Sequence, residues 1–489
     1  MNFAWSLASV INSRCWFTTF AVTIVVLALT SLLGQQPSVH LLMLLIGVAA
    51  SLFLIRQPVL GTIGIVIAGL TLRLDIETGT AVILNPVTLL IPAVLTFWLL
   101  NMVLNQDRRM TPSPANLPLF LFLVASLFSL FVGRATWDPA VPVHNSFYLV
   151  QTAQWAIFAF SAGAFWLTAN LVQDKVFLWR MTATFLTVGG TLAILRLLPG
   201  LDGQMGRFTT IAFIRAPLWA LLTAVAGGQL LWNHRLSILW KLFLATVLLT
   251  GLYYAFFVNR ESSSTWIGVG AALGVLIWLR FPGLRLPLIA AIVILSLTGV
   301  LFPTVYDFAG GDDDWFRTGG SRWALISRVV EVTMRNPVTG LGPAAYRLYA
   351  NMEPLVYAHI FWVDPRVNSH NNYVDLFSHG GLLGVTLFFW FAIEVMRLGL
   401  GLRLRKQYQH GFAGGYINGI LAAGAASLIL MLFADWILPF VYNIGFPGFQ
   451  ASVLVWLFLG GLVSLDRIDK EAEFRNADCL TPELPAERQ

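Results

Sequence analysis

A histidine and an asparagine stand side by side at residues 370 and 371, in an arginine-rich segment. A neutral imidazole can accept the proton of an attacking hydroxyl group, which is the task of a general base. Neighbouring arginines would repel a proton from His370, depress its pKa and favour the neutral form. A lone histidine is more often structural than catalytic. We therefore treat His370 as the first candidate, either as a base or as a hydrogen-bond donor to a phosphate.

Arginines form a second group of candidates, because a guanidinium group grips phosphate oxygens with paired hydrogen bonds and stays charged. The candidate arginines are Arg207, Arg215, Arg260, Arg322 and Arg328. Arg215 is expected inside a span, where an unpaired charge is costly and usually functional. The structural alternative for Arg215 is an ion pair with Asp435.

Two glycines follow the His370–Asn371 pair after nine residues, at the start of an apolar run. Glycines spaced like Gly381 and Gly384 let another helix or a lipid chain approach the backbone closely.

The elements that must position these residues are membrane helices. The chain of 489 residues is 57% hydrophobic and 11% charged, whereas soluble proteins carry about 25% charged residues. Apolar runs of about 17 to 25 residues span a bilayer as helices. We predict fourteen spans, near 15–33, 39–55, 58–72, 84–104, 116–133, 148–172, 180–198, 211–232, 238–257, 264–279, 285–302, 381–399, 413–437 and 447–465. A twelve-span arrangement follows if the third and last are partial. The expected fold is an all-α polytopic membrane protein.

Basic residues in short connections indicate the cytoplasmic side of a membrane protein. When both termini are placed in the cytoplasm, the connections that carry the basic residues all fall on the cytoplasmic side. The net charge of +6 therefore reflects topology and not nucleic-acid binding. Four regions follow. They are a bundle of eleven spans at 1–302, a large periplasmic loop at 303–380, C-terminal spans at 381–465, and a disordered cytoplasmic tail at 466–489.

The large loop contains a predicted helix over residues 321–336, with an apolar stripe that includes Trp323 and Val330. Asn336–Pro337 ends this helix, and the turn Gly340–Leu341–Gly342 follows. The pattern indicates an amphipathic helix, either lying on the outer membrane surface or capping the bundle.

These motifs resemble the O-antigen ligase and polymerase superfamily. The His-Asn pair, nine residues and Gly-x-x-Gly match at His370, Asn371, Gly381 and Gly384. The segment from Arg322 to Gly342 resembles the family's Arg-helix-Asn-Pro-x-x-Gly-x-Gly stretch, and Arg260 matches a third arginine. The resemblance covers roughly residues 205 to 395. Glu261 and Ile326 depart from the family pattern, and the segment around Arg207 and Arg215 matches it only weakly.

The resemblance implies a GT-C-like glycosyltransferase of the bacterial inner membrane with its active site facing the periplasm. Its donor would be an undecaprenyl-diphosphate-linked glycan and its acceptor a hydroxyl group, with inversion at the sugar carbon. The resemblance implies that Arg260 and Arg322 are the catalytic arginines that act with His370. The residues that it implies for substrate binding are Asn371, Arg207, Arg215, Arg328, Gly381 and Gly384. The acceptor stays open between lipid A–core sugar (a ligase), another lipid-linked glycan (an O-antigen or exopolysaccharide polymerase) and a protein hydroxyl. Expected partners are these glycans, the lipid bilayer and other polysaccharide-assembly proteins.

Two alternatives compete with this interpretation. Asp312 to Asp314 could bind a divalent cation, but the sequence favours a solvated acidic loop, so we predict metal-independent transfer without a cofactor. A flippase-like transporter of lipid-linked glycans would suit the span number. Transporters commonly contain repeated halves, and no internal repeat is evident here.

Overall fold

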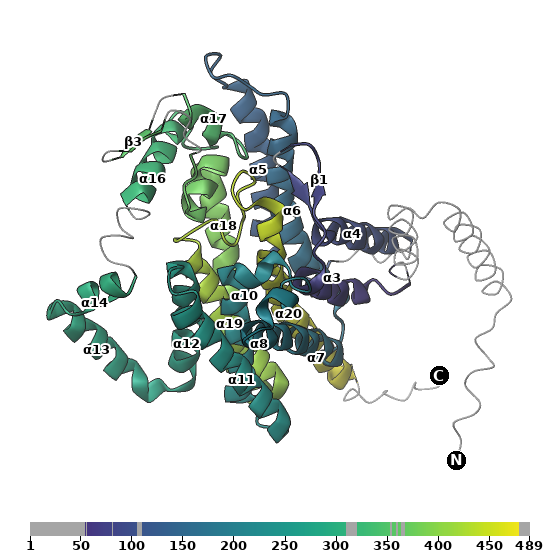
Figure 1. The fold of residues 1–489 in the computed structure, drawn as a ribbon. Helices are drawn as coiled ribbons and strands as arrows, with labels where there is room; N and C mark the ends of the chain where they lie inside the picture. Colours follow the sequence, from purple (N-terminus) through teal and green to yellow (C-terminus); the bar gives the residue numbers. More distant parts are fainter. Residues whose placement is uncertain are drawn as a thin grey trace, which may run out of the picture. The chain divides into compact units, whose positions relative to one another are not determined.

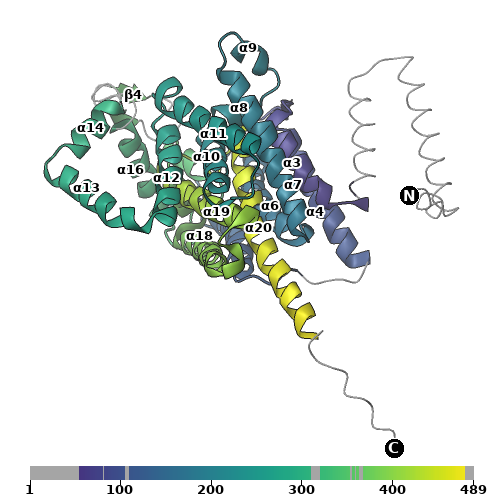
Figure 2. The same cartoon turned by 90° about the horizontal axis from the view of Figure 1, so that it is seen from below.

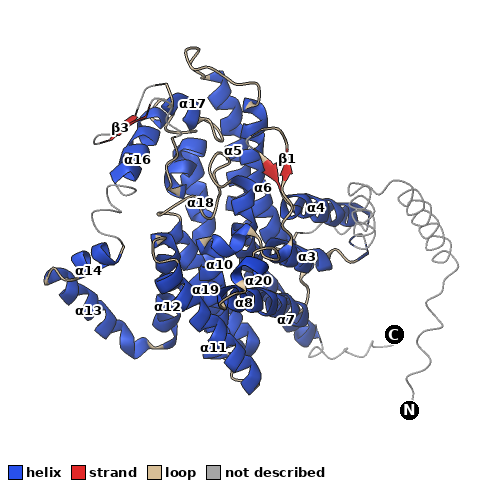
Figure 3. Cartoon of the chain, viewed as in Figure 1, coloured by secondary structure: helices blue, strands red, loops and turns tan. Residues whose placement is uncertain are grey.

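Helices form along nearly all of the chain that the computed structural model describes. The described residues are 54, 56–80, 82–104, 110–309, 320–352, 355–357, 360–362 and 367–478. Their strands are limited to two short antiparallel hairpins, β1 (Ile76–Glu77) with β2 (Ile83–Leu84), and β3 (Leu355–Tyr357) with β4 (Ile360–Trp362) (Figure 3). This composition has a physical cause: inside lipid, every backbone polar group needs a partner, and a helix supplies all of them within one segment.

Eight of the described helices are long and apolar enough to span a membrane, or nine if one bent pair counts as a span. The prediction of an all-α polytopic membrane protein is therefore confirmed. The helices before the large loop are α3 (Val59–Thr71), α4 (Pro86–Leu104), α5 (Asn116–Ala135), α6 (Phe147–Leu171), α7 (Lys175–Thr184), α8 (Gly190–Leu197), α9 (Asp202–Met205), α10 (Ala216–Trp232), α11 (Ile238–Tyr253), α12 (Ser263–Arg280) and α13 (Arg285–Leu297). Those of the loop and the C-terminal part are α14 (Leu301–Phe308), α16 (Gly320–Thr333), α17 (Tyr346–Ala350), α18 (Asn372–Leu404), α19 (Gly411–Leu430) and α20 (Gly445–Asp478).

A helix occupies each of the last twelve predicted span positions, while 15–33 and nearly all of 39–55 lie outside the described residues. Two π-helical turns, Phe185–Gly189 and Tyr254–Val258, interrupt otherwise continuous helices. The predicted span 285–302 is wrong as one straight helix, because α13 and α14 meet at 88°. The predicted span 413–437 is too long, because α19 ends at Leu430 and the next residues form turns.

The boundary predicted at residue 381 between the large loop and the next span falls inside a helix. Helix α18 already begins at Asn372 and runs for 33 residues, with one break at Gly381. The cause is an N-terminal cap: the Asn371 side chain accepts hydrogen bonds from the backbone N–H groups of Tyr373 and Val374, as asparagine commonly does at a helix start.

The tail predicted to be disordered from Asp466 begins as helix, because α20 continues to Asp478 (Figure 2). Ion pairs hold this extension. Arg405 contacts Asp466 at 2.5 Å and Asp469 at 2.9 Å, and Lys175 contacts Asp469 at 3.2 Å. Both carboxylates are nearly fully buried, so partners distant in sequence decide the structure of a segment whose own composition suggested disorder.

Helices α10 and α19 pack closely at the centre of the unit that spans residues 59–489, with α12 and α20 beside them (Figure 1). Their contact depends on small residues: a Cβ atom at Gly228 would lie 2.8 Å from the Gly419 Cα atom. Such close backbone approach is the usual way in which membrane helices gain packing energy.

Helices α16 and α17 and the β3–β4 hairpin lie together at the end of α18 where that helix begins (Figure 1). Helix α16 covers the predicted amphipathic segment and ends three residues before Asn336. It packs against α17 and α18, with Val329 and Val332 buried and Trp323 70% exposed. The loop elements are thus fixed to the first turns of α18, where His370 stands.

Candidate active site

His370 occupies a strained turn immediately before α18. Its φ angle of 48° lies in the left-handed region, which few residues other than glycine adopt, and such strain persists only where neighbouring contacts enforce it. The backbone N–H of His370 donates to the Asn368 side chain at 3.2 Å, and that of Asn371 donates to the Ser369 hydroxyl at 3.0 Å. The side chains of Asn368 and Ser369, which both precede His370, therefore hold the turn.

A buried polar network beneath the turn provides this constraint. The Ser369 hydroxyl donates to the Asp375 carboxylate at 2.7 Å, and the Tyr346 hydroxyl donates to the same oxygen at 3.0 Å. Burial, followed by the nearby Asp375 carboxylate, raises the pKa of Tyr346 well above its ordinary value, which keeps the hydroxyl a donor. The sequence analysis missed Tyr346 and Asp375. The available signal was a carboxylate, Asp375, at the start of an apolar run, where an acidic side chain is expensive.

Burial also sets the protonation of His370. It lowers the pKa of the imidazole to about 4, and the positive charge of Arg322 is the second cause. The sequence analysis attributed the shift to charge repulsion alone, but desolvation is the larger effect because it penalises the imidazolium form. His370 is thus neutral at pH 7 and able to accept a proton.

Residues 431–436, the first part of the connection between α19 and α20, bring three of the predicted site residues together. Arg322 donates to the carbonyl of Phe433 at 3.3 Å, and the Asn371 side chain donates to the carbonyl of Leu432 at 3.1 Å. The Arg215 guanidinium lies 5.5 Å from the centre of the Trp436 ring. Residues from four separate parts of the chain thereby meet at this segment.

The sequence analysis was wrong to place Arg215 inside a span. Arg215 precedes the first turn of α10, next to a short 3-10 helix at Ile211–Ile214. Nor does it form an ion pair within 4.0 Å of Asp435, whose oxygens instead accept hydrogen bonds from Phe440 and Asn443 at 2.8 and 2.7 Å. The Asp435 charge still acts on Arg215 through space.

A pocket of about 710 Å³ opens beside His370. Its described lining residues are His144, Arg347, Leu348, Asn351, Val367, Asn368, His370, Phe440, Val441, Tyr442 and Asn443. The Arg347 guanidinium lies 4.6 Å from the centre of the Tyr442 ring. An arginine, amide groups and a neutral imidazole around one cavity suit a ligand that carries both phosphate and sugar hydroxyl groups. Arg347 was missed because "YRLYA" has no pattern that separates it from other arginines of the loop.

The two glycine motifs of the loop and of α18 contact each other directly. Gly381 has φ 64° and ψ −164°, which breaks α18. The freed N–H groups of Leu382 and Leu383 donate to the carbonyls of Pro337 and Val338, at 2.9 and 3.1 Å. A Cβ atom at Gly340 would lie 2.6 Å from the Gly381 nitrogen. The backbone of the loop therefore packs directly against Gly381. The sequence had predicted that another helix or a lipid chain would make this close contact.

Four other predicted residues lie away from this pocket lining. Arg260 donates to the carbonyl of Phe308 at 3.3 Å and lies over that ring at 4.7 Å, beside α14. Arg207 is exposed in the connection between α9 and α10. Arg328 pairs with Glu331 at 3.8 Å on α16. A Cβ atom at Gly384 would meet only the Leu376 carbonyl, at 3.6 Å, so Gly384 is not needed for close packing.

The acidic run Asp312 to Asp314, the alternative metal site, lies outside the described residues. Among the residues that are described, no group of three or more His, Cys, Asp or Glu side chains is arranged to hold a metal ion. Metal-independent transfer stays a prediction.

Comparison with known proteins identifies the region that contains this site. Residues 245–389 match the model of a protein family described as O-antigen ligase. The match includes Arg260, Arg322, Arg347, His370 and Gly381, and ends within α18. The search of curated proteins gives no match. Residues 245–389, which include α12, α16, α17 and the first part of α18, therefore resemble this family, and the match supports the O-antigen ligase superfamily.

Proposed function

We propose that the protein transfers a glycan from undecaprenyl diphosphate to an acceptor hydroxyl group, at the periplasmic face of the bacterial inner membrane. The observation that carries the proposal is a neutral, half-buried His370 beside Arg322, at the edge of a pocket that Arg347 also lines. A base next to fixed positive charges is the arrangement that displacement of a diphosphate requires. The orientation, with both termini in the cytoplasm, rests on the distribution of basic residues.

The reaction would be a single displacement. The acceptor oxygen forms a bond to the sugar C1 atom while the bond from C1 to the diphosphate oxygen breaks, which inverts the configuration at C1. The acceptor proton passes to the imidazole of His370. The electron pair of the broken bond leaves with undecaprenyl diphosphate, whose added negative charge Arg322 and Arg347 stabilise.

The arginine pair in this proposal differs from the one predicted from sequence. Arg347 replaces Arg260, because Arg347 shares a pocket with His370 whereas the described contacts of Arg260 are with Phe308. Arg215 is a second helper, since its charge faces the segment 431–436 to which Arg322 and Asn371 also bind. A role for Arg260, Arg207 and Arg328 in substrate binding stays a prediction.

The acceptor is the part of the proposal that the site chemistry leaves open. A lipid A–core sugar, a second lipid-linked glycan and a protein serine or threonine all present a hydroxyl group, and His370 would treat each in the same way. The pocket contains polar groups on several sides, so a sugar hydroxyl is the acceptor that we favour.

The test uses the purified chain with an undecaprenyl-diphosphate-linked glycan and each acceptor class in turn, in the presence of a chelator. We expect glycan transfer with release of undecaprenyl diphosphate, and we expect Arg347→Gln to slow it by about a hundredfold because a stabilising charge is lost. Arg335→Gln is the matched control, since Arg335 is exposed and paired with Asp138 outside the pocket lining. Movement of donor across liposomes without transfer would favour the transporter instead.

The depressed pKa of His370 predicts how transfer depends on pH. The folded imidazole binds a proton only near pH 4, whereas an ordinary histidine does so near 6.5. The neutral form, and with it the transfer rate, should therefore persist as the pH falls from 6.5 and decline only on approach to pH 4. As the pH falls, the unfolded chain binds this proton before the folded chain does. The contribution of His370 to folding stability is therefore present above pH 6.5 and is lost as the pH falls from 6.5 to 4.

Initial transfer rates across this pH range, with thermal unfolding measured in parallel, check the prediction. A rate that falls by half near pH 6.5 while the protein remains folded would contradict it.

A further inference from the structure

A second pocket lies at the opposite end of α18 from His370. His370 immediately precedes this helix, and Tyr408 and His410, which follow the helix, line the second pocket. The part of α18 that follows its break at Gly381, residues 382–404, is about 35 Å long at about 1.5 Å per residue. The two pockets are therefore separated by the thickness of a bilayer, and the second one lies on the predicted cytoplasmic side.

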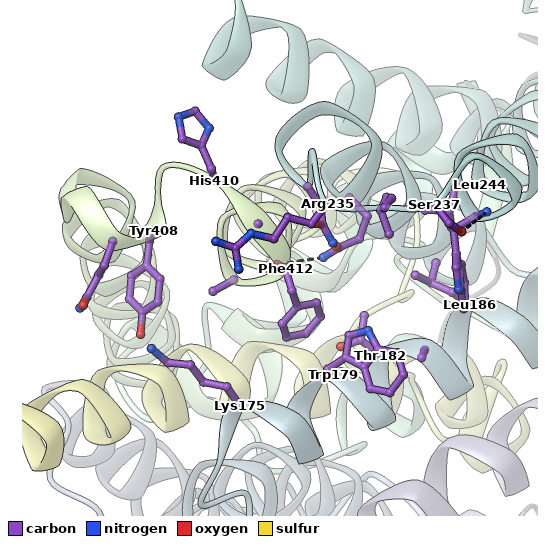
Figure 4. Close-up of a pocket in the computed structure, with 18 residues that line it drawn as sticks. Lys175, Trp179, Thr182, Leu186, Arg235, Ser237, Leu244, Tyr408, His410 and Phe412 are labelled. Atoms are coloured by element: carbon purple, nitrogen blue, oxygen red, sulfur yellow. Dashed lines mark hydrogen bonds between the residues drawn. The ribbon is translucent and has the colours of Figure 1, made fainter.

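The second pocket is cationic. Its volume is about 540 Å³, and Lys175, Arg235 and His410 line it, together with the side-chain amides of Gln229 and Asn233. None of the described residues that line it is acidic. Arg235 is exposed, and no carboxylate in the described part of the chain forms an ion pair with it. In Figure 4 its guanidinium extends toward the side of the pocket that Tyr408 and Lys175 line.

Lys175 is held where it can contribute to the same site. Its ammonium group contacts Asp469 at 3.2 Å and lies 4.9 Å from the centre of the Tyr408 ring. Asp469 offsets part of this charge but is shared with Arg405, which contacts it at 2.9 Å. The arrangement leaves a net positive pocket, which suits an anion.

The remaining wall is apolar and aromatic. Trp179 and Trp240 lie in the N-terminal halves of α7 and α11, and Leu186, Leu244 and Phe412 also line the wall. Trp179 is 45% exposed and the neighbouring Leu239 is 75% exposed. Tryptophans with exposed leucines at helix ends are typical of the interface between lipid and water.

We propose that this pocket binds the headgroup of an anionic phospholipid of the cytoplasmic leaflet. Arg235 would grip the phosphate through paired hydrogen bonds, Lys175 would add charge, and the tryptophans would contact the glycerol and the first part of the acyl chains. A lipid fits better than free phosphate, because a phosphate ion would leave the apolar wall without a ligand. Basic pockets between membrane helices on the cytoplasmic side are a known type of site for anionic headgroups. The proposal is independent of the transfer reaction.

The test is native mass spectrometry of the full-length protein in detergent, titrated with phosphatidylglycerol, phosphatidylcholine or water-soluble glycerophosphoglycerol. We expect wild type to bind one phosphatidylglycerol in preference to phosphatidylcholine, and Arg235→Gln to weaken that binding by about tenfold, as loss of one charge-assisted pair predicts. Arg180→Gln is the matched control, because it removes an exposed charge from α7 outside the pocket lining. Arg235→Lys, which keeps the charge but loses the paired geometry, should give an intermediate affinity.

Three results would overturn the proposal. They are equal binding of the zwitterionic and anionic lipids, an equal loss in the Arg235→Gln and Arg180→Gln variants, and displacement of the lipid by glycerophosphoglycerol at concentrations that match the lipid's own affinity. The last result would assign the pocket to a soluble phosphate ester.

Discussion

Replacement of His370 by glutamine is expected to lower glycan transfer by about 10²- to 10⁴-fold, the usual contribution of a general base. Glutamine keeps the size and hydrogen-bonding ability of the side chain but cannot take up a proton at this pH. Because the strained turn is held by Ser369, Asn368 and the Asp375 carboxylate, the substitution should leave the turn and the protein folded. The measurement is single-turnover transfer with saturating donor and acceptor, alongside thermal unfolding.

The chain offers a matched control in His234, which is exposed and lies outside this pocket lining. His234→Gln should transfer glycan at close to the wild-type rate. If both variants retain full turnover, His370 is not the base. If His370→Gln retains turnover but needs far more donor, the imidazole instead binds a phosphate, the second role left open by the sequence.

Substitution of Gly381 by alanine is expected to have the largest effect on folding. The backbone of Gly381, with φ 64° and ψ −164°, is closed to a residue with a side chain, and its Cβ atom would collide with the Val338 carbonyl. Backbone strain costs about 1–3 kcal/mol, and forced displacement of packed neighbours costs about 1–3 kcal/mol more. The loop would separate from α18 and the hydrogen bonds to Leu382 and Leu383 would be lost.

Gly380→Ala tests this argument one residue away. Gly380 has an ordinary φ angle, and a Cβ atom added there would meet no atom of the described residues within 4 Å, so the substitution should leave the melting temperature nearly unchanged. Thermal unfolding of both variants in the same detergent checks the prediction. Equal melting temperatures for Gly381→Ala and Gly380→Ala would show that the loop does not depend on this junction.

The positions of the helices were largely predictable, because an apolar run must become a helix once it is inside lipid. The errors fall where distant contacts decide the local structure. Asn371 extends α18 into the predicted loop by capping its first turn, and Arg405 extends α20 into the predicted tail by pairing with Asp466 and Asp469. Neither contact can be predicted from the composition of the segment that it stabilises.

The site residues divide in the same way. His370, Asn371 and Arg322 could be selected from sequence because their residue types and motif spacing indicate proton transfer and phosphate binding. The place where these residues come together could not be predicted from sequence. The segment 431–436, which binds Arg322 and Asn371, lies about sixty residues after His370 and has no motif of its own.

The sequence by itself therefore determined a polytopic helical membrane protein with a large loop and a histidine–arginine chemistry, since hydrophobicity and residue type act locally. Only the tertiary structure decided which arginines accompany His370, why Gly381 must be glycine, and how burial keeps the imidazole neutral. These depend on distances, on close backbone contacts and on exclusion of water, and each arises only when segments remote in the chain pack together.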